Sequence, residues 1–146
     1  LQLSELLSNT SSLVHPSLLD SFGVVVLEAI SLGCPIITTN IASFPEMVID
    51  KYNGFLIDTK FSGVNSDFFI QEYSNIKYMK KIIKSLDLSF LENNLYETMK
   101  SITQNPDLLY RMKKNSLKIY QDKFSYQIWN KKMLNIILTS YPELRD

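Results

Sequence analysis

The sequence predicts an α/β fold, in which a partial Rossmann-like parallel sheet is followed by a helical C-terminal segment. Short apolar runs bounded by Gly and Pro alternate with helix-like stretches over residues 1–59. Such alternation favours parallel strands joined by right-handed crossovers. From residue 75 onward, apolar residues recur at the helical spacing instead. We therefore expect a partial Rossmann-like half at 1–59, an irregular insertion at 60–74, and helices at 75–146 that pack on the same domain.

The first elements are expected in the order helix, strand, helix, strand, helix, strand. Leucines at helical spacing mark the segment LQLSELLSN, and Pro16 stops the short apolar strand SLVHPS. A second strand is PIITT, and a short helix is SFPEMVID, with Pro45 near its start. The turn Tyr52-Asn53-Gly54 then leads into a third strand, GFLID.

The run VVVL, which begins at Val24, is the ambiguous element. Its three valines favour a strand on propensity alone. A strand here would leave only Gly33-Cys34 as a turn before PIITT, and this would require an antiparallel hairpin. We therefore expect a helix, because Gly33 and then Pro35 form the usual stop signal for one.

The second half is expected to be helical. Asn75 is a candidate helix cap, Ser89 and Glu92 fit a capping box, and Asn105-Pro106-Asp107 marks a helix start. Apolar stripes at helical spacing are expected at Ile76, Met79, Ile83 and Leu86, at Leu91, Leu95, Met99 and Ile102, at Leu109, Met112 and Ile119, and at Trp129, Met133, Ile136, Ile137 and Tyr141.

Length and composition indicate one ordinary globular domain. The chain has 146 residues, of which 45% are hydrophobic and 21% charged. It has neither a long apolar run typical of a membrane span nor a recognisable secretion signal. Since it begins at Leu1 rather than Met, we expect it to be part of something longer. The single cysteine, Cys34, cannot form an internal disulfide and fits a reducing cytoplasm.

The charge is distributed unevenly along the chain. Residues 1–50 contain five acidic residues and no Lys or Arg, whereas all 15 basic residues follow. This asymmetry argues against nucleic-acid binding by the first third of the chain. No Cys/His cluster or Asp-x-Asp pair suggests a metal site.

Glu28 is the unusual residue of the otherwise apolar stretch Val24–Ile30. A buried carboxylate is costly unless it is hydrogen-bonded, so Glu28 either reaches an edge or meets a polar partner. Its surroundings include an ordered set of chemistry-bearing residues, namely Pro16-Ser17, Asp20, Phe22-Gly23, Glu28-Ala29, Gly33-Cys34-Pro35, Glu46 and Asn53-Gly54.

This set resembles the signature of retaining, nucleotide-sugar-dependent glycosyltransferases of the GT-B fold, family four (glycosyl transferases group 1). The similarity is to the C-terminal part of the donor-binding domain, and the tail from Asn105 to Trp129 also resembles the C-terminal helices of the family. The resemblance implies transfer of a sugar from a donor such as a UDP- or GDP-sugar, with retention of configuration and without a metal. It implies a catalytic role for Asp20 and a donor site made by Ser21, Phe22, Gly23, Val24 and Glu28.

The chemistry of a nucleotide-sugar fits this arrangement. Free amides at a helix start attract the anionic diphosphate, and Gly lets the backbone approach it closely. Carboxylates accept hydrogen bonds from hydroxyls, so the resemblance implies that Glu28 holds the ribose and Asp20 contacts the transferred sugar. The family usually has Glu where this chain has Asp20, which sets the carboxylate back by about 1.5 Å. A misplacement of about an ångström can cost on the order of a hundredfold in rate.

Simpler interpretations stand beside this one. Asp20 or Ser21 would cap the helix, and Glu28 would pair with a distant lysine. At the level of function, the alternatives are a non-catalytic glycosyltransferase-like domain that binds a partner or acceptor, and a nucleotide-sugar epimerase of the same overall fold.

Other polar residues have structural interpretations as their default. His15, with no second catalytic group evident beside it, is expected to be a satisfied core or edge histidine. Cys34 is expected to be a small buried hydrophobe, and Glu46 a helix cap that borders the donor cleft in its functional interpretation. One cluster of lysines is expected by default to form a solvent-exposed helix face. In the functional interpretation, this face contacts an anionic membrane surface from the cytoplasm. That cluster comprises Lys77, Lys80, Lys81 and Lys84.

The resemblance covers only half of a donor domain. It implies that the phosphate cations come from elsewhere, that a missing N-terminal domain binds the saccharide, lipid-linked or protein acceptor, and that residues 1–146 alone do not catalyse transfer. The strand at Leu13–Val14 should then lie at an edge of the sheet rather than between two strands of this chain.

Overall fold

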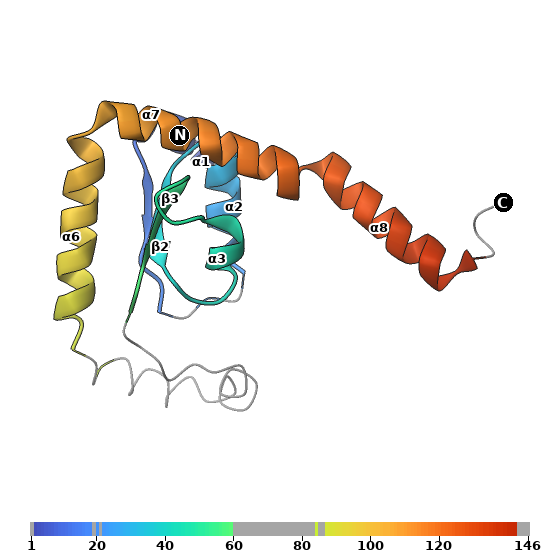
Figure 1. Ribbon diagram of the computed structural model, residues 1–146, viewed down its shortest axis with the longest axis horizontal. Helices are drawn as coiled ribbons and strands as arrows, with labels where there is room; N and C mark the ends of the chain where they lie inside the picture. The colour runs from blue at the N-terminus through green and yellow to red at the C-terminus, as the bar shows by residue number, and fades with distance from the viewer. Residues whose placement is uncertain (1, 19, 21, 60–83, 85–86, 143–146) are drawn as a thin grey trace.

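The computed structural model describes residues 2–18, 20, 22–59, 84 and 87–142 (Figure 1). Three parallel strands form its sheet in the order β1 (Leu13–His15), β2 (Ile36–Thr39) and β3 (Gly54–Ile57). This α/β architecture with a parallel sheet and following helices confirms the predicted fold class. β1 lies at an edge among the described strands, as predicted, because only β2 pairs with it there.

Helices cover both faces of the sheet (Figure 1). α1 (Leu3–Asn9), α2 (Val24–Ser31) and α3 (Phe44–Met47) lie on one face, and α6 (Ser89–Thr103) lies on the other. α7 (Pro106–Ile119) crosses both layers and continues through the π-helical turn η1 (Tyr120–Phe124) into α8 (Tyr126–Ser140). α8 projects away from the sheet, and none of its described side chains is buried.

The core has one layer on each face of β2. Ile36 packs in the layer that contains Ile30 of α2 and Phe44 of α3, whereas Ile37 packs with Leu91 and Met112 on the other side. Successive strand residues point to opposite faces, so one central strand supplies both layers. Every residue of β2 is buried, which is typical of a parallel strand covered on both faces.

The helical half is fixed to the sheet by hydrogen bonds at the amino ends of β2 and β3. The buried Ser116 hydroxyl of α7 lies 3.2 Å from the Cys34 carbonyl oxygen and 3.3 Å from that of Asn53. The Asn115 side-chain amide donates to the Tyr52 carbonyl at 2.8 Å. α7 therefore closes the end of the sheet that faces away from the loop after β1.

Local predictions for the first half are largely confirmed. The ambiguous valine run is helical, and α2 ends where Gly33 takes a left-handed conformation with φ of 73°. Cys34 is buried, with 1% of its surface exposed, as expected of a small apolar residue. The predicted start of α7 is also confirmed, because the Asn105 side chain accepts a hydrogen bond from the Leu108 amide at 3.0 Å.

The predicted capping box at the start of α6 is wrong. Ser89 is already the first residue of the helix, and no side chain caps it from the N-cap position, Leu88. Instead, the Asp87 carboxylate accepts a hydrogen bond from the Ser89 amide at 3.0 Å, and bonds from Ser89 lower the pKa of that carboxyl. The physical reason is that the Asp87 side chain, two residues before Ser89, accepts the bond from the Ser89 amide that Glu92 would accept in a capping box.

Two further predictions lie outside the described residues, namely the irregular insertion at 60–74 and the stripe with its cap at 75–86. The same holds for the lysine face, apart from Lys84, which is exposed. Among the described helices, none is long and apolar enough to span a bilayer.

Candidate functional site

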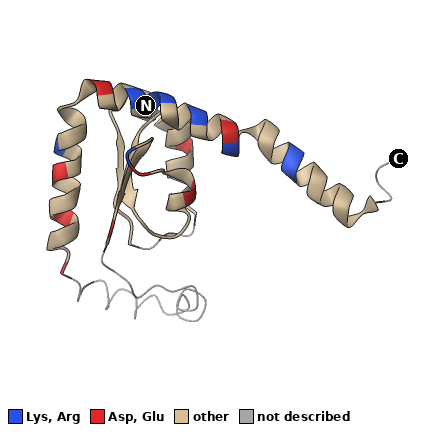
Figure 2. Ribbon diagram, in the orientation of Figure 1, with Lys and Arg blue, Asp and Glu red and all other residues tan. Residues whose placement is uncertain are grey.

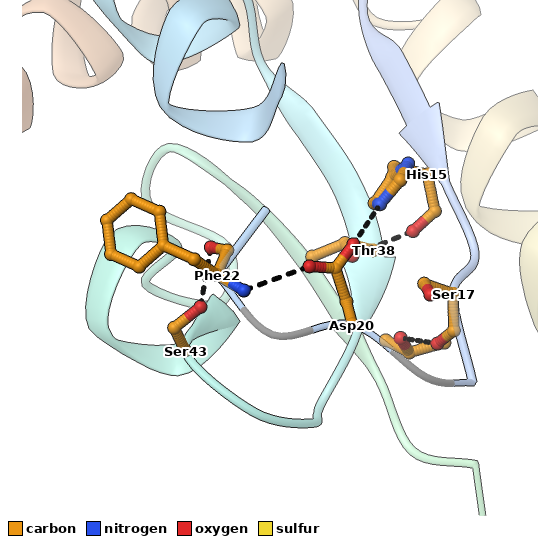
Figure 3. Close-up of polar contacts among 7 residues, drawn as sticks. His15, Ser17, Asp20, Phe22, Thr38 and Ser43 are labelled. Atoms are coloured by element: carbon orange, nitrogen blue, oxygen red, sulfur yellow. Dashed lines mark hydrogen bonds and ion pairs between the residues drawn. The ribbon is translucent and has the colours of Figure 1, made fainter. Parts of the chain in front are cut away.

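Asp20 lies in the loop that leaves the carboxyl end of β1 and leads into α2 (Figure 3). Its Oδ1 atom accepts a hydrogen bond from the Phe22 amide at 3.0 Å, and its Oδ2 atom lies 3.3 Å from His15 Nε2. The side chain keeps 24% of its surface exposed. Ligands of open α/β sheets bind at the carboxyl ends of the strands, so the carboxylate is held by both oxygens at the edge where such a ligand is expected.

Hydroxyl groups from the next two segments tie down this loop (Figure 3). Thr38 Oγ1 donates to the His15 carbonyl at 2.8 Å, and Thr39 Oγ1 donates to the Ser17 carbonyl. Ser43 Oγ donates to the Phe22 carbonyl at 2.6 Å. Both threonines are fully buried at the end of β2, so the loop is anchored to the most rigid part of the sheet. Pre-positioning of this kind is what a binding or catalytic carboxylate requires.

Sequence reasoning did not identify these threonines as part of the site. PIITT was interpreted only as a β-branched strand. Two consecutive hydroxyl residues in an otherwise apolar buried strand were the available signal, because buried polar groups require a partner.

The surroundings of His15 also differ from those that the sequence predicts. We expected no second catalytic group beside it, whereas Asp20 lies within 3.3 Å. The imidazole is also edge-on to the buried Phe44 ring, with centroids 5.5 Å apart and planes at 88°. The chain reverses after Pro16 and returns the carboxylate to the end of β1, and a linear reading of the sequence does not show this.

Gly23 precedes α2 in a left-handed conformation, with φ of 73°. An added Cβ there would lie 2.3 Å from Cε1 of Phe44, so only Gly fits without movement. The Gly23 carbonyl accepts the amides of Val26 and Leu27, whereas those of Val24 and Val25 have no hydrogen-bond partner in the described part of the chain. These two amides begin the helix and form a partial positive charge there. The Phe22 amide, by contrast, is already paired with Asp20.

Glu28 is exposed on the outer face of α2 and shares that face with Val24, which is 60% exposed. The run is therefore amphipathic and not continuous core, since only Val26, Ala29 and Ile30 are buried. No described lysine or arginine lies within ion-pair distance of Glu28, which leaves the carboxylate open to a hydroxyl. It borders a shallow groove of about 220 Å³ between α1 and α2.

A second groove, of about 310 Å³, connects the site loop with α8. Phe22 lines one side of it, and the other side is apolar and aromatic except for Lys123 and Lys132. Both lysines also line a neighbouring hollow with Glu46, which is exposed in the first turn of α3. Basic residues gather along α7, η1 and α8 (Figure 2). The fold thus brings cations from the second half of the chain toward an acidic first half.

The remaining predicted site residue, Ser21, lies outside the described residues. Within the described part of the chain, no group of three or more His, Cys, Asp or Glu side chains is placed to hold a metal ion.

The sequence of the chain is similar to those of known glycosyltransferases. Residues 1–67 match the family model described as glycosyl transferases group 1. The chain is 24% identical to the sucrose synthase of Melioribacter roseus over 123 residues, which are 84% of this chain and 12% of that protein. It is 32% identical to the lipopolysaccharide glucosyltransferase WaaG of Escherichia coli over 91 residues, which are 62% of this chain and 22% of that protein.

A third relative is the D-inositol 3-phosphate glycosyltransferase of Streptomyces avermitilis. It is 38% identical over 56 residues, which are 38% of this chain and 12% of that protein. The chain thus spans less than a quarter of the length of these curated relatives. The glycosyl transferases group 1 similarity lies in its first 67 residues.

Proposed function

We propose that residues 1–146 form the second half of the donor-binding domain of a glycosyltransferase. The complete protein would transfer a sugar from a nucleotide-sugar to a saccharide, lipid-linked or protein acceptor, with retention of configuration and without a metal cofactor. The observation that carries this proposal is the placement of Asp20 at the carboxyl end of β1, directly before a helix whose first two amides have no hydrogen-bond partner among the described residues.

Each part of the site has a role that its chemistry allows. The Asp20 carboxylate would accept a hydrogen bond from a hydroxyl of the transferred sugar near its reacting carbon. The Val24 amide, with the close approach that Gly23 permits, would meet the diphosphate. Glu28 lies four residues into the helix, about 6 Å along its axis from Val24, where it would accept hydrogen bonds from the ribose hydroxyls.

Part of the machinery lies beyond this chain in our proposal. No Lys or Arg precedes Lys51, so the described site loop has no cation of its own from the first third of the chain. Lys123 and Lys132 approach Phe22 from η1 and α8, but a diphosphate also requires screening on its far side. A further domain would supply those cations and the acceptor site. We also propose that the complete protein is cytoplasmic and contacts a membrane surface peripherally.

The test uses the complete protein with UDP-glucose, UDP-galactose and GDP-mannose as donor probes. We expect one of them to bind, and we expect Glu28→Gln to weaken that binding by about 10–100-fold, the usual range for losing a charge-assisted hydrogen bond. Asp20→Asn should lower kcat more than donor affinity. Glu92→Gln, an exposed glutamate on α6, is the matched control and should leave both unchanged.

The outcomes separate the candidate functions. A product whose anomeric configuration differs from that of the donor would exclude retention. Donor binding by the wild type with no transfer, and no gain from Asp20→Glu, would favour the non-catalytic interpretation. No binding of any of the three probes would contradict the proposal.

A further inference from the structure

His15 and Asp20 form a contact that the proposed roles of the site leave unused. His15 is the last residue of β1, and its Nε2 atom lies 3.3 Å from Asp20 Oδ2. The side chains are 28% and 24% exposed, so the pair is partly shielded and still reachable from solvent. It lies at the carboxyl end of β1, where the loop toward α2 begins.

The position of the imidazole is determined from two sides. Thr38 Oγ1 donates to the His15 carbonyl at 2.8 Å and fixes the backbone. The ring itself packs edge-on against Phe44, which is fully buried. Figure 3 shows the ring pointing toward the Asp20 carboxylate from the end of the strand. Asp20, by contrast, belongs to a loop and takes its orientation from its partners.

The direction of the hydrogen bond follows from the chemistry of the two groups. An ionised carboxylate has no proton to donate, so the proton must be on Nε2 of His15. The Phe22 amide already donates to the other oxygen at 3.0 Å. The two donors together restrict rotation of the carboxylate, and His15 is the one supplied by the sheet.

We propose that His15 is a positioning residue, which holds the Asp20 carboxylate at the carboxyl end of β1 through an Nε2–H···Oδ2 hydrogen bond. The inference deepens the proposed function and rests on it where it concerns catalysis. His15 does not contact substrate in this proposal. It keeps the carboxylate in the geometry from which Asp20 would meet the sugar, and an error of about an ångström in that geometry costs on the order of a hundredfold in rate.

Two substitutions separate the hydrogen bond from the ring packing. His15→Gln keeps an N–H donor at the distal end of the side chain and removes the ring, whereas His15→Phe keeps the ring against Phe44 and removes the donor. In the complete protein, we expect His15→Phe to lower kcat by about 10–100-fold with little change in donor KM. We expect His15→Gln to retain most of the activity. Equal losses in both variants, or full activity in His15→Phe, would overturn the proposal.

A second measurement does not depend on activity. In an NMR spectrum of the complete protein, the imidazole N–H signal of His15 is identified by its loss in the variant His15→Phe. We expect a slowly exchanging Nε2–H signal in the wild type that disappears in Asp20→Ala while the core amide signals persist. If the wild type lacks that signal, the positioning role fails. If the signal is present but the complete protein transfers no sugar, the proposed function fails and the His15–Asp20 contact stands.

Discussion

Replacing Gly23 with Ala tests the geometry of the site loop most directly. Gly23 has φ of 73°, a left-handed conformation that costs an L-residue about 1–2 kcal/mol. The new methyl group would also lie 2.3 Å from Cε1 of Phe44, which is fully buried and cannot move outward freely. Overpacking of a core typically costs about 1–3 kcal/mol more. We therefore expect Gly23→Ala to lower the free energy of unfolding by about 2–5 kcal/mol.

Gly33→Ala provides the matched control. Gly33 has the same φ of 73°, but its added Cβ would meet Leu117 Cγ at 3.0 Å. Leu117 is 40% exposed and its side chain can rotate away, although the Lys113 carbonyl at 3.3 Å leaves little room on the other side. Gly33→Ala should therefore cost mainly the conformational term, about 1–2 kcal/mol.

Urea unfolding of the wild type and the two variants measures the difference. The reasoning requires Gly23→Ala to be the more destabilising variant, since only Gly23 faces a buried aromatic ring. Equal losses would show that Phe44 yields and that the contact at Gly23 is not a constraint. A loss below about 1 kcal/mol in Gly23→Ala would refute the left-handed conformation as well.

Two further predictions concern buried polar groups. Thr38→Val removes the hydroxyl that bonds the His15 carbonyl and should cost about 1–3 kcal/mol in urea unfolding. The control Thr103→Val, at an exposed position of α6, should stay within about 0.5 kcal/mol of the wild type, and equal effects would contradict the anchoring role of Thr38. Burial raises the pKa of the Cys34 thiol from 9.0 to about 11, outweighing a backbone hydrogen bond with Leu13 and the nearby Lys113 charge. As the pH rises, the unfolded chain therefore loses this proton before the folded chain does, and the free energy of unfolding should fall between pH 9 and pH 11. The fall should be less steep in Cys34→Ala. Equal slopes of unfolding free energy against pH in the wild type and the variant would refute this.

The elements of the first half could be predicted from the sequence because their signals are local. Gly33 and Pro35 follow directly after α2, and this stop signal favours a helix over the alternative antiparallel hairpin. The parallel sheet also followed from the order of strands and helices, and the edge position of β1 was implied by the resemblance to half of a donor domain. The start of α6 could not be predicted in the same way, because the carboxylates of Asp87 and Glu92 are both candidate acceptors for the Ser89 amide and the folded geometry selects Asp87.

Side-chain environments depended on the tertiary structure. Glu28 is solvent-exposed because α2 turns only one face to the sheet, and no property of the run VVVLEAI specifies which face that is. Asp20 meets His15 only after the loop reverses, and Thr38 reaches the backbone of His15 from 23 residues away because β1 and β2 pair in parallel.

The sequence alone therefore determined the helices and strands of the first half and their order, and it predicts the residues that a donor site would use. Only the packed structure decided that a histidine contacts the carboxylate, that two threonines and a serine anchor its loop, and that none of the described α8 side chains is buried. The physical reason is the range of the forces involved. Turn and helix signals act over a few residues, whereas hydrogen bonds and packing act between groups that become neighbours only when the sheet has formed.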